Sequence, residues 1–326
     1  MQRGTFFLVV LLSIVFNTIN YSQEKQERIM PPRAEKIPKE LVNHGITRID
    51  NYYWLNQKEN PKVIDYLNAE NQFLELTMKN TEQYQEKLYK EIVGRIKQTD
   101  QSVPYKENGY WYYTRFEEGE EYPIHCRKKE SLESEEEILL NVNELAKGHK
   151  YYNVSGLEVS PDNNILAFGV DTLSRRIFTI HFKDLTTGKI FEQTIPNTTG
   201  SAVWANDNKT IFYTTKDETL RAYKIFRHKL GSDFKNDVEI YHEADETFNC
   251  FVYNTKSREY LIIASNSTLS NEYRFLNANT PNEEFKIVQP RERNLEYRVD
   301  HFGKYFYIVT DRKSVVYGKS VYIGGG

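Results

Sequence analysis

Short runs of aromatic and β-branched residues recur along the chain, and their spacing limits what it can fold into. Four of the runs are centred on Ala167, Phe212, Ile262 and Phe306, which lie 45, 50 and 44 positions apart, and an earlier run covers residues 110–113. Repeats of about 40–50 residues are typical of four-stranded propeller blades. The sequence therefore predicts a mainly β chain that forms the N-terminal part of a β-propeller, with four blades and the start of a fifth.

The turns that precede two of these runs support the prediction. Residues 160–164 read Ser-Pro-Asp-Asn-Asn, and residues 205–209 read Ala-Asn-Asp-Asn-Lys. Asp and Asn side chains hydrogen-bond their own backbone and tolerate positive φ, so Asp-Asn pairs favour hairpin turns. The composition agrees, because 24 Tyr and 18 Phe against only 10 Pro favour strands.

The first 22 residues are expected to form a secretory signal peptide. Arg3 supplies a positive charge, residues 6–16 form an apolar run, and polar residues follow. The run is shorter than the roughly 20 residues that a membrane-spanning helix needs, so a retained anchor is disfavoured. We expect an exported protein, with the periplasm as its compartment and no stable membrane insertion after cleavage.

The chain contains two cysteines, Cys126 and Cys250. Two cysteines do not make a disulfide framework, even in an exported protein. A single bridge between them and a pair of buried free thiols are both open. The free thiols are favoured, because a core of this size needs no cross-link.

Residues 23–102 are predicted to form an extended arm followed by two helices. Asn60 is expected to cap the first helix, with Pro61 at its first position. The second helix is expected to open at Asn80, with Gln83 completing a capping pair. Apolar residues recur on one face of each helix: Val63, Tyr66, Leu67, Phe73, Leu74 and Met78 on the first, and Tyr84, Leu88, Ile92 and Ile96 on the second. Packing against a further domain is expected to cover both stripes.

The residues that carry common chemistries are absent or scattered. The 43 Lys and Arg against 46 Asp and Glu give a net charge of -3, which offers no basic surface for nucleic acid. The sequence contains no Gly-x-Ser-x-Gly, His-Glu-x-x-His, Cys-x-x-Cys, Walker loop or Gly-x-Gly-x-x-Gly. Its 7 histidines occur singly, which is typical of structural histidines. We therefore assign no catalytic residue, no cofactor and no metal ligand.

Charged runs offer weaker signals. The glutamates within residues 117–121 and 135–137 are expected to lie in loops, where a solvated surface is favoured over attraction of a cationic peptide. Two arginine pairs, Arg175 with Arg176 and Arg291 with Arg293, could bind carboxylates across blades or between domains. Exposed pairs of this kind stabilise a fold little.

Several segments resemble a known family. Residues 31–34 (Pro-Pro-Arg-Ala) and 44–55, which include Asn51-Tyr52-Tyr53-Trp54-Leu55, look like the N-terminal signature of the prolyl oligopeptidase family, and within it most like the oligopeptidase B group. The likeness continues through residues 88–100, 103–105, 109–115, 121–127, 203–207 and 289–291. It covers the chain from about Pro31 to Thr310.

The resemblance implies a fold and an activity for a longer product. Members are serine peptidases in which a seven-bladed propeller caps an α/β-hydrolase domain, and the oligopeptidase B group cleaves short peptides after Lys or Arg. In the family the propeller filters substrates by size. The catalytic Ser, Asp and His are expected to lie beyond the end of this chain, so His125 and Asp162 are not assigned to a triad. The arm and helices of residues 23–102 are expected to pack on the hydrolase domain.

Two further expectations complete the domain plan. Residues 103–310 should form the partial propeller, whereas residues 311–326 resemble the translation of a sequencing adapter and are expected to be a non-native tail. The resemblance implies a peptidase that acts on short peptides containing basic residues, with the present chain inactive by itself. The alternative is a non-enzymatic, exported propeller that binds a partner.

Overall fold

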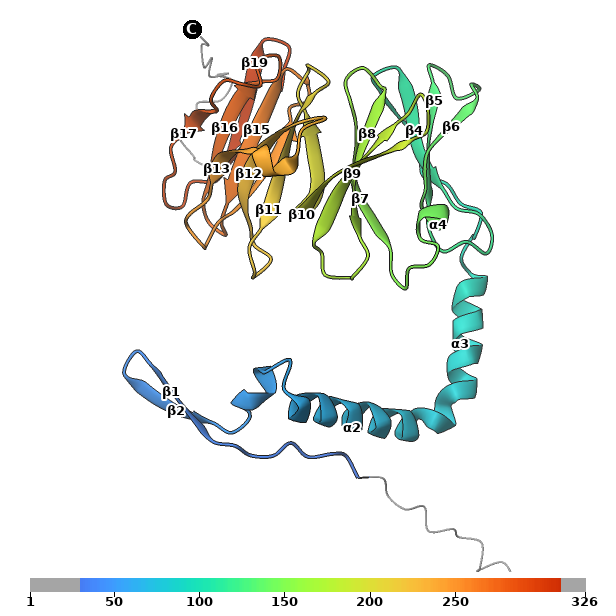
Figure 1. The fold of residues 1–326 in the computed structure, drawn as a ribbon, viewed down its shortest axis with the longest axis vertical. Coiled ribbons are helices and arrows are strands. Elements are labelled where there is room, and N and C mark those ends of the chain that lie inside the picture. Colours follow the sequence, from blue (N-terminus) through green and yellow to red (C-terminus); the bar gives the residue numbers. More distant parts are fainter. Residues whose placement is uncertain (1–29, 312–326) are drawn as a thin grey trace, which may run out of the picture. The chain divides into compact units, whose positions relative to one another are not determined.

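The computed structural model describes residues 30–311, so the predicted signal peptide and all but the first residue of the predicted tail lie outside it. The chain divides into two compact units, one ending at Lys97 and the other beginning at Gln98. Each is described by itself below (Figure 1). Among the described residues, no helix has the length and apolar character needed to cross a membrane.

The first unit contains a hairpin and the two predicted helices. Strands β1 (Lys39–Asn43) and β2 (Ile46–Asp50) form the hairpin, and a short 3-10 turn, η1 (Tyr53–Asn56), follows. The indole of Trp54 is buried and donates to the carbonyl of Glu35 at 2.9 Å. Helix α2 (Pro61–Met78) begins where predicted, because the Asn60 side chain accepts from the Lys62 amide at 3.0 Å.

The start of the second helix was predicted wrongly. Asn80 lies inside the 3-10 turn η2 (Lys79–Thr81), and helix α3 runs over Glu82–Gly94 with Thr81 as its N-cap. An N-cap with a bonding side chain needs extended backbone, but Thr81 is helical and its hydroxyl donates back to the Met78 carbonyl at 2.7 Å. The capping pair of Asn80 with Gln83 therefore does not form, and Ile96 falls beyond the helix.

The apolar stripes of both helices are largely exposed within this unit. Exposed members are Leu67, Leu74 and Met78 on α2 and Tyr84, Leu88 and Ile92 on α3, while Val63 is buried. Ile64, Leu76 and Tyr89 on the same helices are exposed as well. The hairpin adds exposed Val42, Ile46 and Ile49. So much unpaired apolar surface is unusual for a unit that stands alone.

The second unit is built from four-stranded antiparallel blades, as predicted. The first blade comprises β3 (Tyr105–Glu107), β4 (Tyr110–Arg115), β5 (Ile124–Lys129) and β6 (Glu136–Asn141), followed by the short helix α4 (Val142–Leu145). The second and third blades form one seven-stranded sheet of β7 (Asn153–Val159), β8 (Ile165–Asp171), β9 (Phe178–Asp184), β10 (Ile190–Trp204), β11 (Thr210–Lys216), β12 (Ala222–Lys229) and β13 (Val238–His242), with the 3-10 turn η3 (Phe234–Asn236) before β13.

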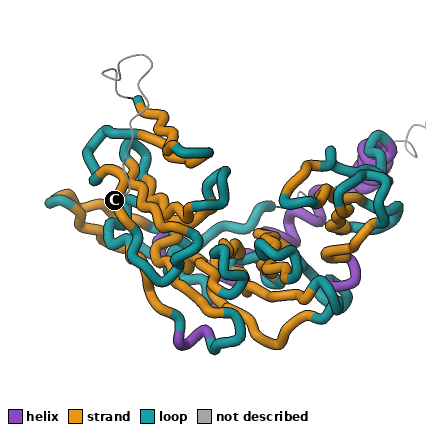
Figure 2. Tube along the Cα trace, turned by 90° about the horizontal axis from the view of Figure 1, so that it is seen from above, coloured by secondary structure: helices purple, strands orange, loops and turns teal. Residues whose placement is uncertain are grey.

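A fourth blade and the first hairpin of a fifth follow. The fourth contains β14 (Asn249–Asn254), β15 (Tyr260–Asn266), β16 (Asn271–Asn277) and β17 (Lys286–Gln289), and the hairpin contains β18 (Tyr297–Phe302) and β19 (Tyr305–Thr310). The strands of this unit lie around an arc (Figure 2). Among the described strands, β19 pairs only with β18, so the sheets do not close into a ring.

The repeated aromatic runs of the sequence are the second strands of the blades, β4, β8, β11, β15 and β19. Their side chains pack between neighbouring sheets. One cluster joins Leu139 and Leu140 of the first blade to Phe168 of the second, and another joins Phe212 of the third blade to Leu261 of the fourth. Since burying one such side chain contributes about 1.5–3 kcal/mol, these interblade clusters account for the arrangement of the blades.

The long strand β10 joins two blades and depends on glycine. Its first part pairs with β9 and its last part with β11, and the register shifts at a bulge between Thr198 and Ala202. Here the backbone crosses very close to β8. A Cβ on Gly169 would lie 2.4 Å from the carbonyl oxygen of Gly200, which is closer than real atoms approach. Only glycine fits at this crossing.

Two side-chain expectations are settled by the described residues. Cys126 and Cys250 are free and buried, which confirms the favoured alternative. The acidic run at residues 135–137 was wrongly expected to be a solvated loop, since β6 begins at Glu136. Two of its carboxylates pair with arginines: Glu136 with Arg115 at 2.9 Å and Glu137 with Arg127 at 2.7 Å.

Candidate functional site

A cavity lined by both polar and apolar side chains lies where the first strands of the blades converge. It has a volume of about 930 Å³. Strands β3, β7 and β14 line it, together with the last part of β10 and the turns that follow these strands. The first strand of each blade borders the cavity because every blade repeats the same four-stranded meander in the same orientation. Side chains from distant parts of the sequence therefore meet there.

Three charged side chains bridge this cavity. Arg258, in the turn between β14 and β15, forms an ion pair with Glu107 at the end of β3. Its other terminal nitrogen lies 3.8 Å from a carboxylate oxygen of Glu158 on β7. Arg258 has φ of 60° and its carbonyl accepts from Asn206 at 3.2 Å, so the turn holds the arginine in place. The cluster thus links the fourth blade to the first and second.

The pKa of Glu158 is unusual. Burial by the cavity walls raises it from 4.5 to about 7, the negative charge of Glu107 raises it further, and Arg258 only partly offsets both. The side chain is still 37% exposed, because it faces the open space of the cavity. Near neutral pH the group is therefore only partly charged, and its charged form lacks a full set of partners.

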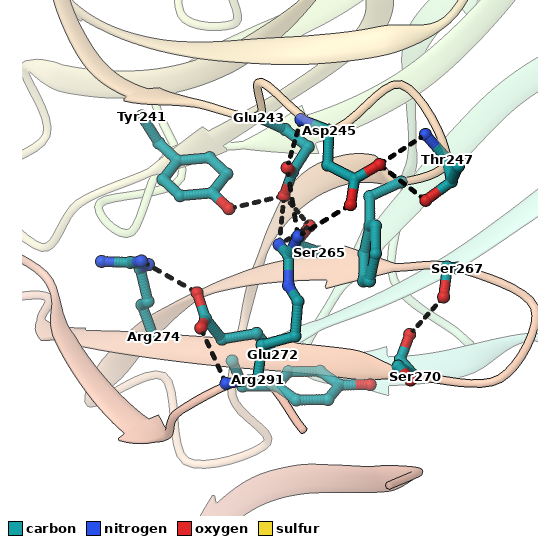
Figure 3. A network of polar contacts seen from close by, with 12 residues as sticks. Tyr241, Glu243, Asp245, Thr247, Ser265, Ser267, Ser270, Glu272, Arg274 and Arg291 are labelled. Carbon is teal, nitrogen blue, oxygen red and sulfur yellow. Dashed lines mark hydrogen bonds and ion pairs between the residues drawn. The ribbon is translucent and has the colours of Figure 1, made fainter. Parts of the chain in front are cut away.

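A second polar cluster lies at the junction of the third and fourth blades (Figure 3). Arg291, which follows β17, bonds Glu243 at 2.5 Å across 48 positions of sequence. The same carboxylate accepts from Tyr241 at 2.8 Å, from the hydroxyl of Ser265 and from a backbone amide. This confirms that Arg291 pairs across blades.

Burial alone would raise the pKa of Glu243. The hydrogen bonds from Arg291, Ser265 and Tyr241 outweigh this effect and lower the pKa to about 2. The Glu243 side chain is only 4% exposed. Arg221 fixes the same loop from the other side, since it donates to the carbonyls of Glu243, Asp245 and Phe248. Glu243 is thus a saturated structural carboxylate.

The other arginines and the acidic loop carry no site. The side chains of Arg175, Arg176 and Arg293 are exposed and form no ion pair within the described part of the chain. The glutamates of residues 117–121 lie in an exposed loop, where Glu117 pairs with Arg115. Between residues 30 and 311, no group of three His, Cys, Asp or Glu side chains is placed to hold a metal ion.

The histidines do not form a catalytic dyad. His125 is half-buried on β5 and lines the cavity, and burial lowers its pKa. Asp162 lies in the turn after β7, where it accepts from the hydroxyl of Ser160 at 2.5 Å. No hydrogen bond or ion pair joins these two described residues.

A buried histidine–aspartate pair does occur elsewhere, and sequence reasoning missed it. His228 bonds Asp237 at 2.7 Å through Nδ1, and its Nε2 lies 2.7 Å from the amide nitrogen of Gln193. The ring is fully buried, and an amide stands where a nucleophilic hydroxyl would be needed. The pair is therefore structural. Its members come from three different strands or turns, so no short motif could have revealed it.

Repeated four-stranded blades around a cavity define the second unit as part of a β-propeller. The family model described as "Prolyl oligopeptidase, N-terminal beta-propeller domain" matches residues 31–319. The chain belongs to this family, which confirms the resemblance seen in the sequence.

Similar proteins with curated names support the same family. The chain is 40% identical over 300 residues to dipeptidyl aminopeptidase BI of Pseudoxanthomonas mexicana, covering 86% of this chain and 41% of that protein. It is 32% identical over 287 residues to protease 2 of Moraxella lacunata, covering 86% and 42%. The chain thus spans about two fifths of the length of the curated relatives it matches.

Solved structures show the same likeness. Oligopeptidase B from Leishmania major superposes with a TM-score of 0.82 at 30% identity, covering 87% of this chain and 43% of that one. Oligopeptidase B from Trypanosoma brucei, in a closed form with covalently bound antipain, gives 0.80 at 27% identity, with 87% and 43% covered. The chain corresponds to the N-terminal, propeller-containing portion of these peptidases.

Proposed function

We propose that this chain is the propeller portion of a serine-type oligopeptidase that hydrolyses short peptides after Lys or Arg. Membership of the prolyl oligopeptidase family over residues 31–319 carries the proposal, and the likeness to two oligopeptidase B structures supports the specificity. The propeller would cap the active site and admit only short or unfolded peptides. The serine, its base and the groups that bind the basic side chain would belong to an α/β-hydrolase domain.

The exposed apolar stripes support the presence of such a domain. Leu67 and Leu74 on α2 and Leu88 and Ile92 on α3 remain in solvent within their own unit. We propose that the hydrolase domain covers them, and that the 326-residue chain has no peptidase activity by itself. The same surfaces should make the isolated chain prone to association. Export to the periplasm is part of the same proposal and rests on the apolar run near Met1.

A second specificity has its own support. The relative at 40% identity is named a dipeptidyl aminopeptidase, which implies release of dipeptides from a free amino terminus rather than internal cleavage. The two alternatives differ in what the substrate presents on the amino-terminal side of the cleaved bond. A non-enzymatic, partner-binding propeller is the remaining alternative.

The decisive experiment uses the product of the complete gene beside the 326-residue chain. Each is assayed with two chromogenic substrates, an Arg-Arg anilide with a blocked amino terminus and the same anilide with a free one. Cleavage of the blocked substrate by the complete product alone supports the oligopeptidase. Cleavage of the free-amino substrate alone supports dipeptide release, and no cleavage of either supports the binding protein.

Specificity is checked with a third substrate. Replacing Arg by citrulline at the cleaved position keeps the shape of the side chain and removes its charge. We expect kcat/KM to fall by about two to three orders of magnitude, since a buried acidic pocket would lose its ionic partner. Equal rates for Arg and citrulline substrates would contradict specificity for basic residues.

A further inference from the structure

The charged cluster in the cavity is unbalanced. Arg258 stands between Glu107 and Glu158, so one guanidinium faces two carboxylates. It forms a close ion pair with Glu107 but stays 3.8 Å from Glu158. The second carboxylate therefore has room and charge for another cation.

The other charged groups around the cavity do not supply that cation. Lys106 and Lys256 also line it, but neither lies within ion-pair distance of Glu107 or Glu158. The Lys106 ammonium lies 5.8 Å from the ring centroid of Trp111. His125 is held neutral by burial, which lowers its pKa. Burial also raises the pKa of Glu158, and the negative charge of Glu107 raises it further.

We propose that Glu107 and Glu158 form a binding site for the Arg or Lys side chain of a peptide, and that Arg258 is the internal occupant which such a side chain displaces. Arg258 itself shows that the site accepts a guanidinium group. The cavity volume of about 930 Å³ falls in the range of pockets that enclose small ligands. The choice of a peptide as ligand rests on the proposed function, and the propeller would then take part in selecting basic substrates.

The site is tested by calorimetric binding to the 326-residue chain at pH 8, where Glu158 is charged. The probes are Ala-Arg-Ala and Ala-citrulline-Ala, each acetylated at the amino end and amidated at the carboxyl end, so that one side chain carries the only difference in charge. We expect the Arg peptide to bind about tenfold more tightly, as for a charge-assisted hydrogen bond. Equal affinities would overturn the proposal.

Two substitutions at the site should act in opposite directions. Glu158→Gln should reduce affinity for the Arg peptide to that of the citrulline peptide, whereas Arg258→Ala should increase it severalfold by removing the competitor. Glu259→Gln and Lys209→Ala make the same changes in charge at exposed positions outside the cavity lining and should leave the Arg preference within about twofold. If Lys209→Ala strengthens binding as much as Arg258→Ala, the net charge of the chain explains the result and the proposed site is wrong.

The reactivity of the two cysteines towards a thiol reagent tests where the peptide binds. Cys126 lines the cavity and Cys250 does not, while burial raises the pKa of both thiols to about 12. At saturation, the Arg peptide should slow the reaction of Cys126 with a small thiol reagent severalfold and leave Cys250 unchanged. Binding that leaves both rates unchanged would place the peptide elsewhere and overturn the proposal.

The two proposals can fail separately. Binding is measured on this chain and needs no catalysis, whereas the peptidase assay needs the complete gene product. Arg-selective binding together with an inactive gene product would support the binding site and contradict the proposed peptidase activity. An active gene product together with a propeller that binds Arg and citrulline peptides equally would support the peptidase and contradict the binding site.

Discussion

Glu243 and Glu158 are the same residue type in two regions of one propeller, and their surroundings shift their pKa values in opposite directions. At the junction of the third and fourth blades, bonds from Arg291, Ser265 and Tyr241 lower the pKa of Glu243 to about 2. In the cavity, burial and a neighbouring carboxylate raise that of Glu158 to about 7. The first carboxylate has every partner it can use, and the second does not.

This contrast separates a structural carboxylate from a candidate binding residue without the help of a sequence motif. A buried carboxylate that is fully hydrogen-bonded stabilises a junction and has no capacity left for a ligand. A charge that is desolvated but incompletely paired weakens the fold and gains energy when a ligand arrives. On this basis the blade junction is structural, and the cavity is the candidate site.

The largest expected effect comes from Arg291→Ala. The change leaves the carboxylate of Glu243 buried without its cation. It also removes the packing of the guanidinium on the Phe248 ring, whose centroid lies 3.6 Å from the Cζ atom of Arg291. Breaking a buried pair in this way typically costs about 3–5 kcal/mol. The free energy of unfolding, measured in urea, should fall by about 3 kcal/mol.

A second variant isolates the charge. Adding Glu243→Gln to Arg291→Ala removes the unpaired carboxylate, so the double variant should recover about half of the lost stability. A double variant less stable than the single one would show that Glu243 stabilises the junction without Arg291. In that case the carboxylate would not depend on its cation.

The sequence predicted one half of this junction and not the other. The blade period places the second strands correctly, and Arg291 was one of four arginines considered as partners for carboxylates across blades or between domains. Its partner was not identified, because Glu243 lies 48 positions away and the two meet only through the packing of two sheets. Glu107, Glu158 and Arg258 were missed for the same reason, since they come from three blades and share no local pattern.

Predictions from local sequence patterns were wrong where backbone geometry or pairing with distant residues determined the structure. Asn60 caps α2 because its backbone is extended, but Asn80 lies inside a continuous turn and cannot cap α3. The glutamates of residues 135–137 look like a loop by charge alone. Glu136 and Glu137 nevertheless lie in β6, where they pair with Arg115 and Arg127.

A smaller effect is expected from Ser265→Ala. The Ser265 hydroxyl donates to the buried carboxylate of Glu243 and lies 3.2 Å from Arg291. Losing one hydrogen bond to a charged group should reduce the free energy of unfolding by about 1.5 kcal/mol. The urea midpoint at pH 7 measures this, with Ser267→Ala as a control in the next turn. Equal losses from both would show that the bond to Glu243 is not special.

The two carboxylates should also respond oppositely to pH. The lowered pKa of Glu243 contributes stability above pH 4.5 that is lost as the pH falls towards 2. The raised pKa of Glu158 contributes stability below pH 4.5 that is lost as the pH rises through about 7. Glu158→Gln should therefore be more stable than the parent chain at pH 8 and not at pH 4.5, by less than about 1 kcal/mol because the group is partly solvated. Urea midpoints at the two pH values would contradict this if the difference were the same at both.

The smallest effect is expected from Arg258→Ala, which makes the same chemical change as Arg291→Ala in the other region. Its guanidinium is 46% exposed, and Glu107 and Glu158 are 40% and 37% exposed, so solvent can replace it. Exposed pairs contribute about 0–1 kcal/mol, and the free energy of unfolding should change by about 0.5 kcal/mol or less. The two arginines therefore differ severalfold in what their removal costs, although each bonds a glutamate of another blade. A loss near 3 kcal/mol at Arg258 would make the cavity cluster a second structural junction, and the contrast between a saturated and an unsaturated carboxylate would no longer hold.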